Sequence, residues 1–593
     1  MSPPASPRAS DRRQAGLIRR LAVLLLAVAC AAPLAMNVAC PDLWGHVLYG
    51  QEWIGSGRLP RTATHTFTAV GQPWVNHELL AERLLAGGFR VGGVVGMQAA
   101  KVALGMAMLL LMASAARRHA TAPIVTWSVL LTVANALEGF FPIRPQLLSF
   151  LYCSLLLWLL DRSVASRDSS ASHEAIDWRP LLGVPPLMAV WANSHGGFAF
   201  GLLLLAAVLG GRLIESLIQR REGVWWAAAG SAAVLMASVS ATLINPYGWR
   251  LHAWLGESLA APRPEITEWD APTVGNPVFA PFVVLLVLTL VSLLASERRR
   301  DWTQVAVLAV VAWQAAEHLR HIALFAILCG FWLPPHTQSA GRRVVRWFAG
   351  RRTLRYPWPG AEATPLLRRV AVAGLAGLVA LQATIVGERL RELPVYRSHW
   401  PVDAVQWMAD HRVGGDVLVC FNWAQYAMAA LAPDIRVAVD GRFRTCYPQA
   451  VIDRHFDFLL ADGQPRYRAE GSGPIDRRRT LREDRPDYVL LDRRYPAPVH
   501  QMQRLASEPR SAWALLYQDA LAQLWGRRPV VDDPASDRYV PPERRFVSDH
   551  YSMTAVNWPG APRRGAAFAG EPTGRVAKNA VSGASADTPN TNG

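Results

Sequence analysis

Long hydrophobic runs recur along the chain, separated by short polar and arginine-containing segments. Leu21–Val38, Val102–Ala116 and Leu366–Val386 are clear examples. A helix rises 1.5 Å per residue, so about 20 apolar residues cross the roughly 30 Å of hydrocarbon in a bilayer. The whole pattern predicts about 11 spans, at 17–38, 94–116, 121–138, 146–161, 181–194, 198–218, 224–244, 281–296, 302–317, 319–334 and 366–387. We therefore expect a polytopic α-helical membrane protein.

Composition agrees with this interpretation, because 51% of the 593 residues are hydrophobic and the mean hydropathy is +0.14. These values exclude an ordinary soluble enzyme of this length. The net charge of +16 comes largely from arginines in alternate loops, and such loops stay in the cytoplasm. With a cytoplasmic N-terminus, the inner loops hold Arg19 and Arg20, Arg117 and Arg118, Arg220 and Arg221, Arg298–Arg300, and Arg342–Arg355. An odd number of spans then places everything after about residue 388 outside, and no nucleic-acid module is evident.

The chain divides into four parts by pattern. Residues 1–16 are expected to be a disordered cytoplasmic N-terminus, and 17–387 a transmembrane domain with a first outer loop at 39–93. Residues 394–528 alternate short apolar strands with amphipathic helices, which predicts a small extracytoplasmic α/β domain. Residues 529–593 are expected to be a mostly disordered tail. The first span has a basic front end like that of a signal peptide, and an uncleaved anchor is preferred because polar residues follow it directly.

The six cysteines show no zinc-binding spacing. Cys420 and Cys446 fall in the outer domain, where an oxidising compartment permits a disulfide. Two free thiols are an equal alternative.

Polar residues crowd the outer ends of the predicted spans, where ionisable groups are costly and usually functional. They are His46, His65, Asn76, His77, Glu78, Arg144, Gln146, Asn193, His195, Asn245, His252, Glu268, Glu317, His318, Arg320 and His321. We expect them to converge on one outward-facing cavity. The alternative for any one of them is a loop or cap residue in contact with water.

Several short motifs stand at these outer ends. They are Pro41-Asp42-Leu43-Trp44-Gly45-His46, Trp74-Val75-Asn76-His77-Glu78, Arg144-Pro145-Gln146, Trp191-Ala192-Asn193-Ser194-His195-Gly196-Gly197, Asn245-Pro246-Tyr247-Gly248 and Arg320-His321. Phe421-Asn422-Trp423-Ala424-Gln425-Tyr426 and Val439-Asp440-Gly441-Arg442 follow in the outer domain. With these motifs the chain resembles bacterial glycosyltransferase-like membrane proteins related to the GT-C superfamily, whose members use polyprenyl-phosphate-linked sugars.

The resemblance implies a GT-C-like fold and an inverting hexosyl or pentosyl transfer on the outer face of the bacterial inner membrane. GT-C enzymes have an acidic residue in the first outer loop, and Asp42 matches that placement. It would be the general base, with His46 four residues on beside it. The alternative for Asp42 is a helix N-cap.

The remaining candidates would bind substrate. Arg144, His195, Arg320 and His321 suit the departing phosphate. Asn76, His77 and Glu78 suit sugar hydroxyls or a divalent cation, or else cap a helix at 79–89. Gln146, Asn193 and Asn245 complete the substrate-binding set.

The partners expected are membrane lipid, a polyprenyl-phosphate-sugar donor, and a glycan, lipid or protein acceptor. A lipid-linked donor is favoured because the chain has neither a glycine-rich nucleotide loop nor an Asp-x-Asp pair. In the outer domain, Asp440 and Arg442 are expected to make local contacts around a turn at Gly441. Two other classes are a lipid-linked glycan transporter or flippase, which would show inverted repeats, and a non-enzymatic membrane scaffold.

Overall fold

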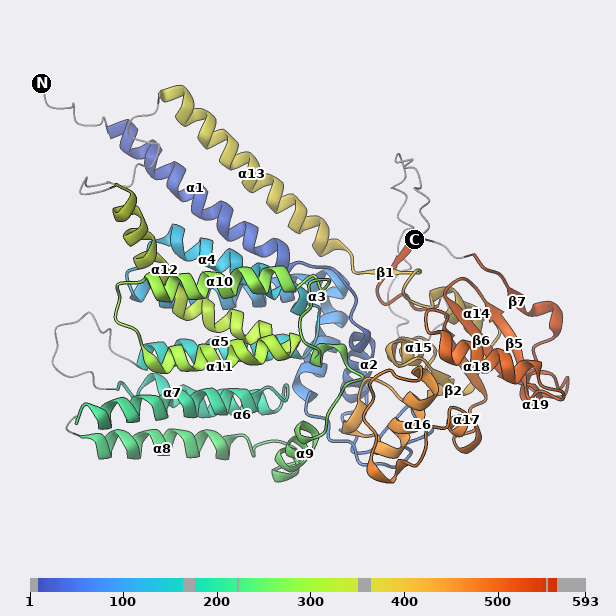
Figure 1. The fold of residues 1–593 in the computed structure, drawn as a ribbon. Helices are drawn as coiled ribbons and strands as arrows, with labels where there is room; N and C mark the ends of the chain where they lie inside the picture. Colours follow the sequence, from blue (N-terminus) through green and yellow to red (C-terminus); the bar gives the residue numbers. More distant parts are fainter. Residues whose placement is uncertain (1–8, 164–175, 221–222, 350–363, 551–552, 563–593) are drawn as a thin grey trace, which may run out of the picture.

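A computed structural model describes residues 9–163, 176–220, 223–349, 364–550 and 553–562. Its N-terminal two thirds is a bundle of helices, and its C-terminal third is an α/β domain at one end of that bundle (Figure 1). A helix lies at each of the eleven predicted spans. They are α1 (Ala9–Leu34), α3 (Leu79–Arg118), α4 (Pro123–Leu137), α5 (Gln146–Ser163), α6 (Val184–Ala192), α7 (Phe198–Ile218), α8 (Val224–Ala241), α10 (Phe279–Ala295), α11 (Trp302–Glu317), α12 (Ile322–Ala349) and α13 (Pro365–Arg391).

By length and composition, six helical segments among the described residues are long and apolar enough to cross a membrane. They are Arg13–Leu34, Leu79–Arg118, Pro123–Phe140, Phe198–Ile218, Val224–Ala241 and Pro365–Arg391. Pro180–Ala192 and Phe279–Ala295 are apolar but shorter. The long helix α3 is broken at Gly93, which has φ 56° and ψ −152°. Glycine tolerates this backbone conformation, so the helix changes direction where the predicted span begins.

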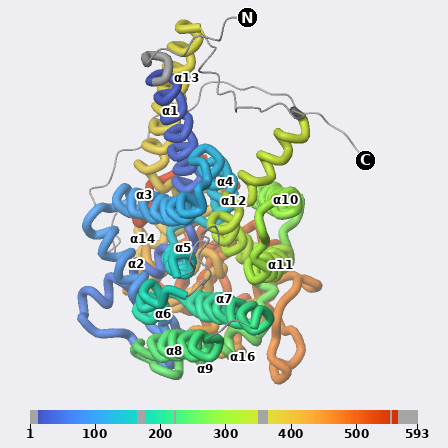
Figure 2. The backbone as a smooth tube through the Cα atoms, turned by 90° about the vertical axis from the view of Figure 1, so that its left-hand side faces the viewer, coloured from blue at the N-terminus to red at the C-terminus, as the bar shows by residue number. Residues whose placement is uncertain are grey.

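Small residues let the helices of the bundle approach closely. A side chain at Gly211 of α7 would overlap Thr303 of α11, and one at Gly330 of α12 would overlap Met112 of α3. Small residues at such contacts are the usual means of helix association in lipid. As a result α7 and α11 lie side by side, while α1 and α13 pair at the edge of the bundle (Figure 2).

The arginine-containing connections that the sequence assigns to the cytoplasm lie at the end of the bundle opposite the α/β domain (Figure 1). They include Arg117 and Arg118 at the end of α3, Arg220 after α7, and Arg298–Arg300 between α10 and α11. Part of the segment Arg342–Arg355 lies outside the described residues. This distribution is the one that the positive-inside rule requires if the α/β domain is on the outer side.

The α/β domain is built on a six-stranded sheet with the order β3-β2-β4-β6-β5-β7. The strands are β2 (Gly415–Val419), β3 (Ile435–Val437), β4 (Tyr488–Asp492), β5 (Trp513–Gln518), β6 (Ala522–Arg527) and β7 (Phe546–Val547). β2 pairs in parallel with β3 and β4, whereas β6 runs antiparallel to β4 and β5. β4 is buried along its whole length, as expected for a central strand covered on both faces.

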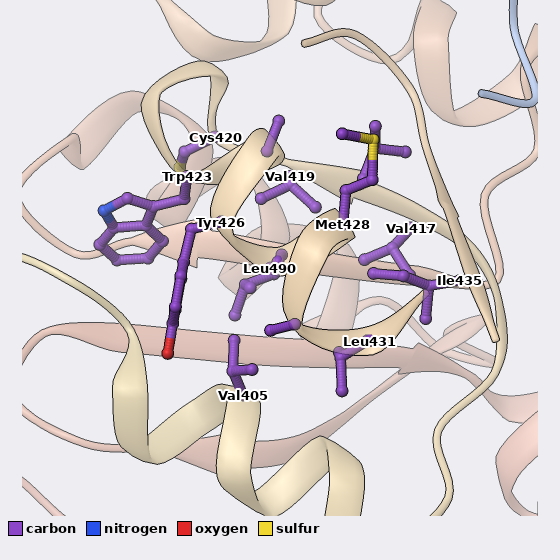
Figure 3. Packing of buried hydrophobic residues seen from close by; sticks show 14 of the residues in the cluster. Val405, Val417, Val419, Cys420, Trp423, Tyr426, Met428, Leu431, Ile435 and Leu490 are labelled. Atoms are coloured by element: carbon purple, nitrogen blue, oxygen red, sulfur yellow. The ribbon is translucent and has the colours of Figure 1, made fainter. Parts of the chain in front are cut away.

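Helices α14 (Val402–Asp410), α15 (Ala424–Leu431), α16 (Gln449–Leu459) and α18 (Pro496–Ser507) accompany this sheet. Figure 3 shows Tyr426 and Leu431 of α15 packed with Val419 and Leu490 of the neighbouring strands. The alternating pattern of residues 394–528 therefore predicts the secondary structure of the domain well.

The six cysteines are all free and buried. β2 does neighbour β3, as a disulfide between Cys420 and Cys446 would require, but the bond is not formed. Cys420 instead accepts a hydrogen bond at its sulfur from the backbone nitrogen of Asp492, at 3.0 Å. Of the two alternatives left by the sequence, the structure has free thiols.

The stretch after residue 528 differs from the disorder expected there. Within its described part, β8 (Ala555–Asn557) pairs antiparallel with β1 (Pro394–Tyr396). The Trp558 side chain is buried, with its ring 4.8 Å from that of Phe89 on α3. Residues 563–593, also part of the expected disorder, lie outside the described residues.

Candidate functional site

A large cavity of about 1590 Å³ extends along the bundle between α7 and α11. Apolar and small side chains form most of its wall, among them Phe200, Leu203, Gly210, Val307 and Val310. Leu203 and Val310 are respectively 70% and 57% exposed, so this wall presents free apolar surface. The cavity is suited to a long hydrocarbon chain.

The end of the cavity nearer the α/β domain is polar. His77, Gln146, His195, Arg263, Trp269, Arg320 and His321 line it. Five of these are residues that the sequence predicts for substrate binding, and Arg263 and Trp269 are additional. The opposite end is lined by Glu215, Gln219 and Arg298–Arg300.

Two guanidinium groups flank the indole of Trp269 at the polar end. The Arg320 guanidinium lies 4.5 Å from the ring centroid and the Arg263 guanidinium 5.3 Å from it. Within the described part of the chain, neither arginine forms an ion pair with a carboxylate. Burial, followed by the nearby charges of Arg444 and Arg320, lowers the pKa of Arg263 to about 10. The polar end therefore presents two guanidinium groups that are not bonded to a carboxylate, next to an apolar channel.

Asp42 lies in the first turn of α2 (Pro41–Ser56), and its carboxylate is held by Arg144. Arg144 Nη2 donates to Asp42 Oδ2 at 3.0 Å, and Arg144 also forms an ion pair with Glu268. The N-cap of α2 is Cys40 and has no side-chain capping bond. Asp42 is thus not the N-cap of its helix.

The α/β domain reaches Asp42 from the other side. An added side chain at Gly441 would lie 2.5 Å from Asp42 Oδ1. The amide nitrogen of Gln425, in the orientation that satisfies both of its polar atoms, donates to the backbone oxygens of Pro41 (3.3 Å) and Asp42 (3.0 Å). Two of the outer-domain motifs therefore contact the first turn of α2.

Glu78 connects His46 with the histidines that line the cavity. Its Oε1 is 3.9 Å from His77 Nε2 and from His195 Nε2, and its Oε2 is 3.9 Å from His46 Nδ1. Burial raises the pKa of Glu78, but His77, His46 and His195 outweigh it, so the pKa is lowered. Burial lowers the pKa of His195 to about 3, against the opposing effect of Glu78, so this imidazole is neutral.

His46 faces Glu82 on α3, at 3.4 Å between His46 Nδ1 and Glu82 Oε1. Asn76 Nδ2 donates to Glu82 Oε2 at 2.6 Å, and Asn76 Oδ1 accepts the backbone N–H of Glu78 at 3.0 Å. Burial lowers the pKa of His46, but Glu78 and Glu82 outweigh it and raise the pKa above its usual value.

The twelve predicted site residues therefore fall into separate groups. His77, Gln146, His195, Arg320 and His321 line the cavity; His46, Asn76 and Glu78 form a cluster next to it; and Asp42 and Arg144 form an ion pair. Asn193 and Asn245 belong to none of the three groups, and their side-chain nitrogens donate to backbone oxygens of Ile244 and Thr242 respectively.

Sequence reasoning did not single out Glu82 or Arg263. Glu82 follows Glu78 by four residues at the start of a helix, so both side chains emerge on one face. This spacing was a usable signal. Arg263 lies in an irregular segment between α9 (Trp249–Ala260) and the next short helix, where no periodicity indicates its direction.

No family model matches the chain, and no curated protein matches it either. Among solved structures it is similar to the Archaeoglobus fulgidus oligosaccharyltransferase tethered with an acceptor peptide (TM-score 0.48, 10% identity, 80% of this chain and 69% of that one). It is also similar to ArnT from Cupriavidus metallidurans bound to undecaprenyl phosphate (TM-score 0.48, 11% identity, 89% and 99%). A third similar structure is the arabinofuranosyltransferase AftD from Mycobacteria (TM-score 0.45, 15% identity, 86% and 40%). Because all three TM-scores lie below 0.5, we infer the function from the residues of this chain.

Proposed function

We propose that the chain is a GT-C-type glycosyltransferase that transfers a sugar from a polyprenyl-phosphate-linked donor to an acceptor on the outer face of the bacterial inner membrane. One observation carries the proposal: an apolar cavity along α7 and α11 ends at two guanidinium groups without carboxylate partners among the described residues. An amphiphile with a long hydrocarbon tail and an anionic head group satisfies both halves of this cavity.

The phosphate of the donor would lie between Arg320 and Arg263. Arginine binds phosphate oxygens through charge-assisted hydrogen bonds, and such bonds are stronger in a site that excludes water. The hydrocarbon tail would extend along Leu203 and Val310, whose exposed apolar surface it would cover. Burial of such surface contributes roughly 25 cal/mol per Å², so the tail supplies affinity and the arginines fix the position of the phosphate.

Asp42 would act as the general base. The acceptor hydroxyl attacks the anomeric carbon, its proton passes to the Asp42 carboxylate, and the bond from that carbon to the phosphate oxygen breaks. Polyprenyl phosphate then leaves with its charge facing Arg320 and Arg263. Arg144 binds Oδ2 of Asp42, whereas Oδ1 lies next to Gly441. Arg144 would therefore orient the base instead of binding phosphate.

The outer-face location is supported by the distribution of arginines. Arg117, Arg118 and Arg298–Arg300 lie at the end of the bundle opposite the α/β domain (Figure 1). Because arginine-rich connections remain in the cytoplasm, the candidate site would open to the outer side. The N-terminus would then be cytoplasmic.

Binding of undecaprenyl phosphate to the purified full-length chain in detergent tests the donor class. Each charged hydrogen bond contributes about 1.5 to 3 kcal/mol, so Arg320→Ala and Arg263→Ala should each weaken binding by roughly 10- to 150-fold. The matched control is Arg504→Ala, because Arg504 is an exposed arginine on α18 whose guanidinium donates to Gln501. Equal affinities for the wild type and both cavity variants would contradict the proposal.

A further inference from the structure

The cluster of His46, Glu78 and Glu82 lies where α2 meets the start of α3. One ligand atom of each side chain lies within 4.8 Å of the others. His46 and Glu82 are buried, and Glu78 is half-buried. The cluster is separate from the arginine-flanked end of the cavity, and Glu78 approaches His77 and His195, which line that cavity.

The imidazole nitrogens around the Glu78 carboxylate are farther from it than hydrogen-bonded atoms would be. Glu78 has imidazole nitrogens of His46, His77 and His195 at 3.9 Å, whereas N–H···O bonds have lengths of about 2.7 to 3.2 Å. Among the described residues, none donates a hydrogen bond to the Glu78 carboxylate. Three nitrogen atoms thus surround a half-buried carboxylate without bonding it.

The same distances suit ligands of one shared ion. Two ligands at about 2.0 to 2.1 Å from a tetrahedral ion are roughly 3.4 Å apart. The His46–Glu82 distance is 3.4 Å, and the His46–Glu78 distance of 3.9 Å is slightly longer. The ligand atoms of Glu78 and Glu82 lie within 4.8 Å of each other, so the two carboxylates would move closer together around a bound ion.

The surroundings fix this arrangement. Asn76 donates to Glu82 Oε2, which leaves Oε1 directed at His46, and its Oδ1 binds the backbone of Glu78. Outer-shell bonds of this kind orient metal ligands. In addition, Gly50 allows α2 to approach the α3 turn that carries Glu82, because a side chain there would overlap the Glu82 backbone oxygen.

We propose that His46, Glu78 and Glu82 bind a divalent transition-metal ion of the Zn²⁺ type. Two carboxylates and one neutral imidazole balance a doubly charged ion, and the nitrogen ligand favours Zn²⁺ over Mg²⁺. Three protein ligands leave a coordination position open, as in catalytic zinc sites. The site is a property of the folded chain and does not depend on sugar transfer.

Metal content of the purified full-length protein tests the site directly. After removal of metal with a chelator and equilibration with Zn²⁺, the wild type should bind about one equivalent by elemental mass spectrometry. Glu82→Gln and His46→Asn should bind substoichiometric amounts, and Asn76→Ala should bind roughly 10- to 100-fold more weakly. Glu52→Gln is the matched control, because Glu52 also lies on α2 and pairs with His65 away from the cluster.

Thermal unfolding supplies a second readout that does not require any variant to fold. Zn²⁺ should raise the unfolding temperature of the chelator-treated wild type, because it binds the folded chain in preference to the unfolded one. A wild type that takes up no Zn²⁺ and is not stabilised by it would overturn the site, as would equal loss in Glu52→Gln. Stabilisation by Mg²⁺ but not Zn²⁺ would overturn the assigned ion class. Loss of sugar transfer with Zn²⁺ retained would count against the proposed function and not against this site.

Discussion

Arg442 is expected to be a major source of stability at the junction of the α/β domain with the first outer loop. It forms a bidentate ion pair with Asp440, with Nε at 2.9 Å from Oδ1 and Nη2 at 2.7 Å from Oδ2. Arg442 also donates to the backbone oxygen of Thr64 and stacks over the rings of Tyr49 and Trp74, at 4.8 and 4.9 Å. Asp440 is fully buried.

Replacing Arg442 with Met would keep much of the volume and leave the Asp440 carboxylate buried without its cation. Breaking a buried ion pair in this way costs about 3 to 5 kcal/mol. Each kcal/mol lowers the unfolding temperature of a domain of this size by roughly 2 to 4 °C, so a fall of roughly 6 to 20 °C is expected. Limited proteolysis of membranes should also cleave the α/β domain sooner.

Arg436→Met is the matched control for this prediction. Arg436 forms an equally well-oriented pair with Asp416 in the same domain, at 2.8 and 3.0 Å, but its side chain is 52% exposed. Exposed pairs contribute about 0 to 1 kcal/mol. If Arg442→Met lowered the unfolding temperature no more than Arg436→Met, the buried pair of Arg442 and Asp440 would not be what stabilises the junction of the α/β domain with the first outer loop.

Three further predictions address the base, the outer domain and the topology. Asp42→Asn should insert and fold normally but lose about 10² to 10⁴ in transfer rate, measured as restoration of envelope glycans in a deletion strain; near-normal restoration would exclude Asp42 as the base. Burial lowers the pKa of His455 to about 3, and neither ring nitrogen has a hydrogen-bond partner among the described residues. As the pH falls, the unfolded chain therefore takes up a proton on His455 before the folded chain does. The contribution of the neutral imidazole to the stability of the fold is present above about pH 6.5 and is lost as the pH falls further. The wild type should lose about 2 kcal/mol more than His455→Gln between pH 7 and pH 5, and equal losses in urea unfolding would contradict this. A reporter active only in the cytoplasm should work when fused after residue 300 and be silent after residue 450; activity at 450 would reverse the orientation.

The helices of the bundle were predictable because hydropathy and arginine placement are local properties of the sequence. The eleven spans each correspond to a helix, and the strands of the α/β domain follow from its alternating pattern. The pairing of Pro394 with Asn557 was not predictable, because β1 and β8 are far apart in sequence and β8 is only three residues long.

The partners of the candidate site residues were also beyond local pattern. Arg144 suits phosphate by its chemistry, but the fold brings Asp42 and Glu268 to its guanidinium from distant loops. Arg320 is left without such a carboxylate among the described residues. Which arginine remains available for an anion is therefore decided by tertiary structure.

The central claim is that the cavity between α7 and α11 holds the lipid tail while Arg320 and Arg263 hold its phosphate. A photoactivatable polyprenyl phosphate, crosslinked to the full-length protein and mapped by peptide mass spectrometry, tests this most directly. The account predicts that labels carried in the tail fall on α7 and α11, at residues such as Leu203 and Val310, and that excess undecaprenyl phosphate competes them away. Labels spread over the edge helices α1 and α13, without competition, would contradict it.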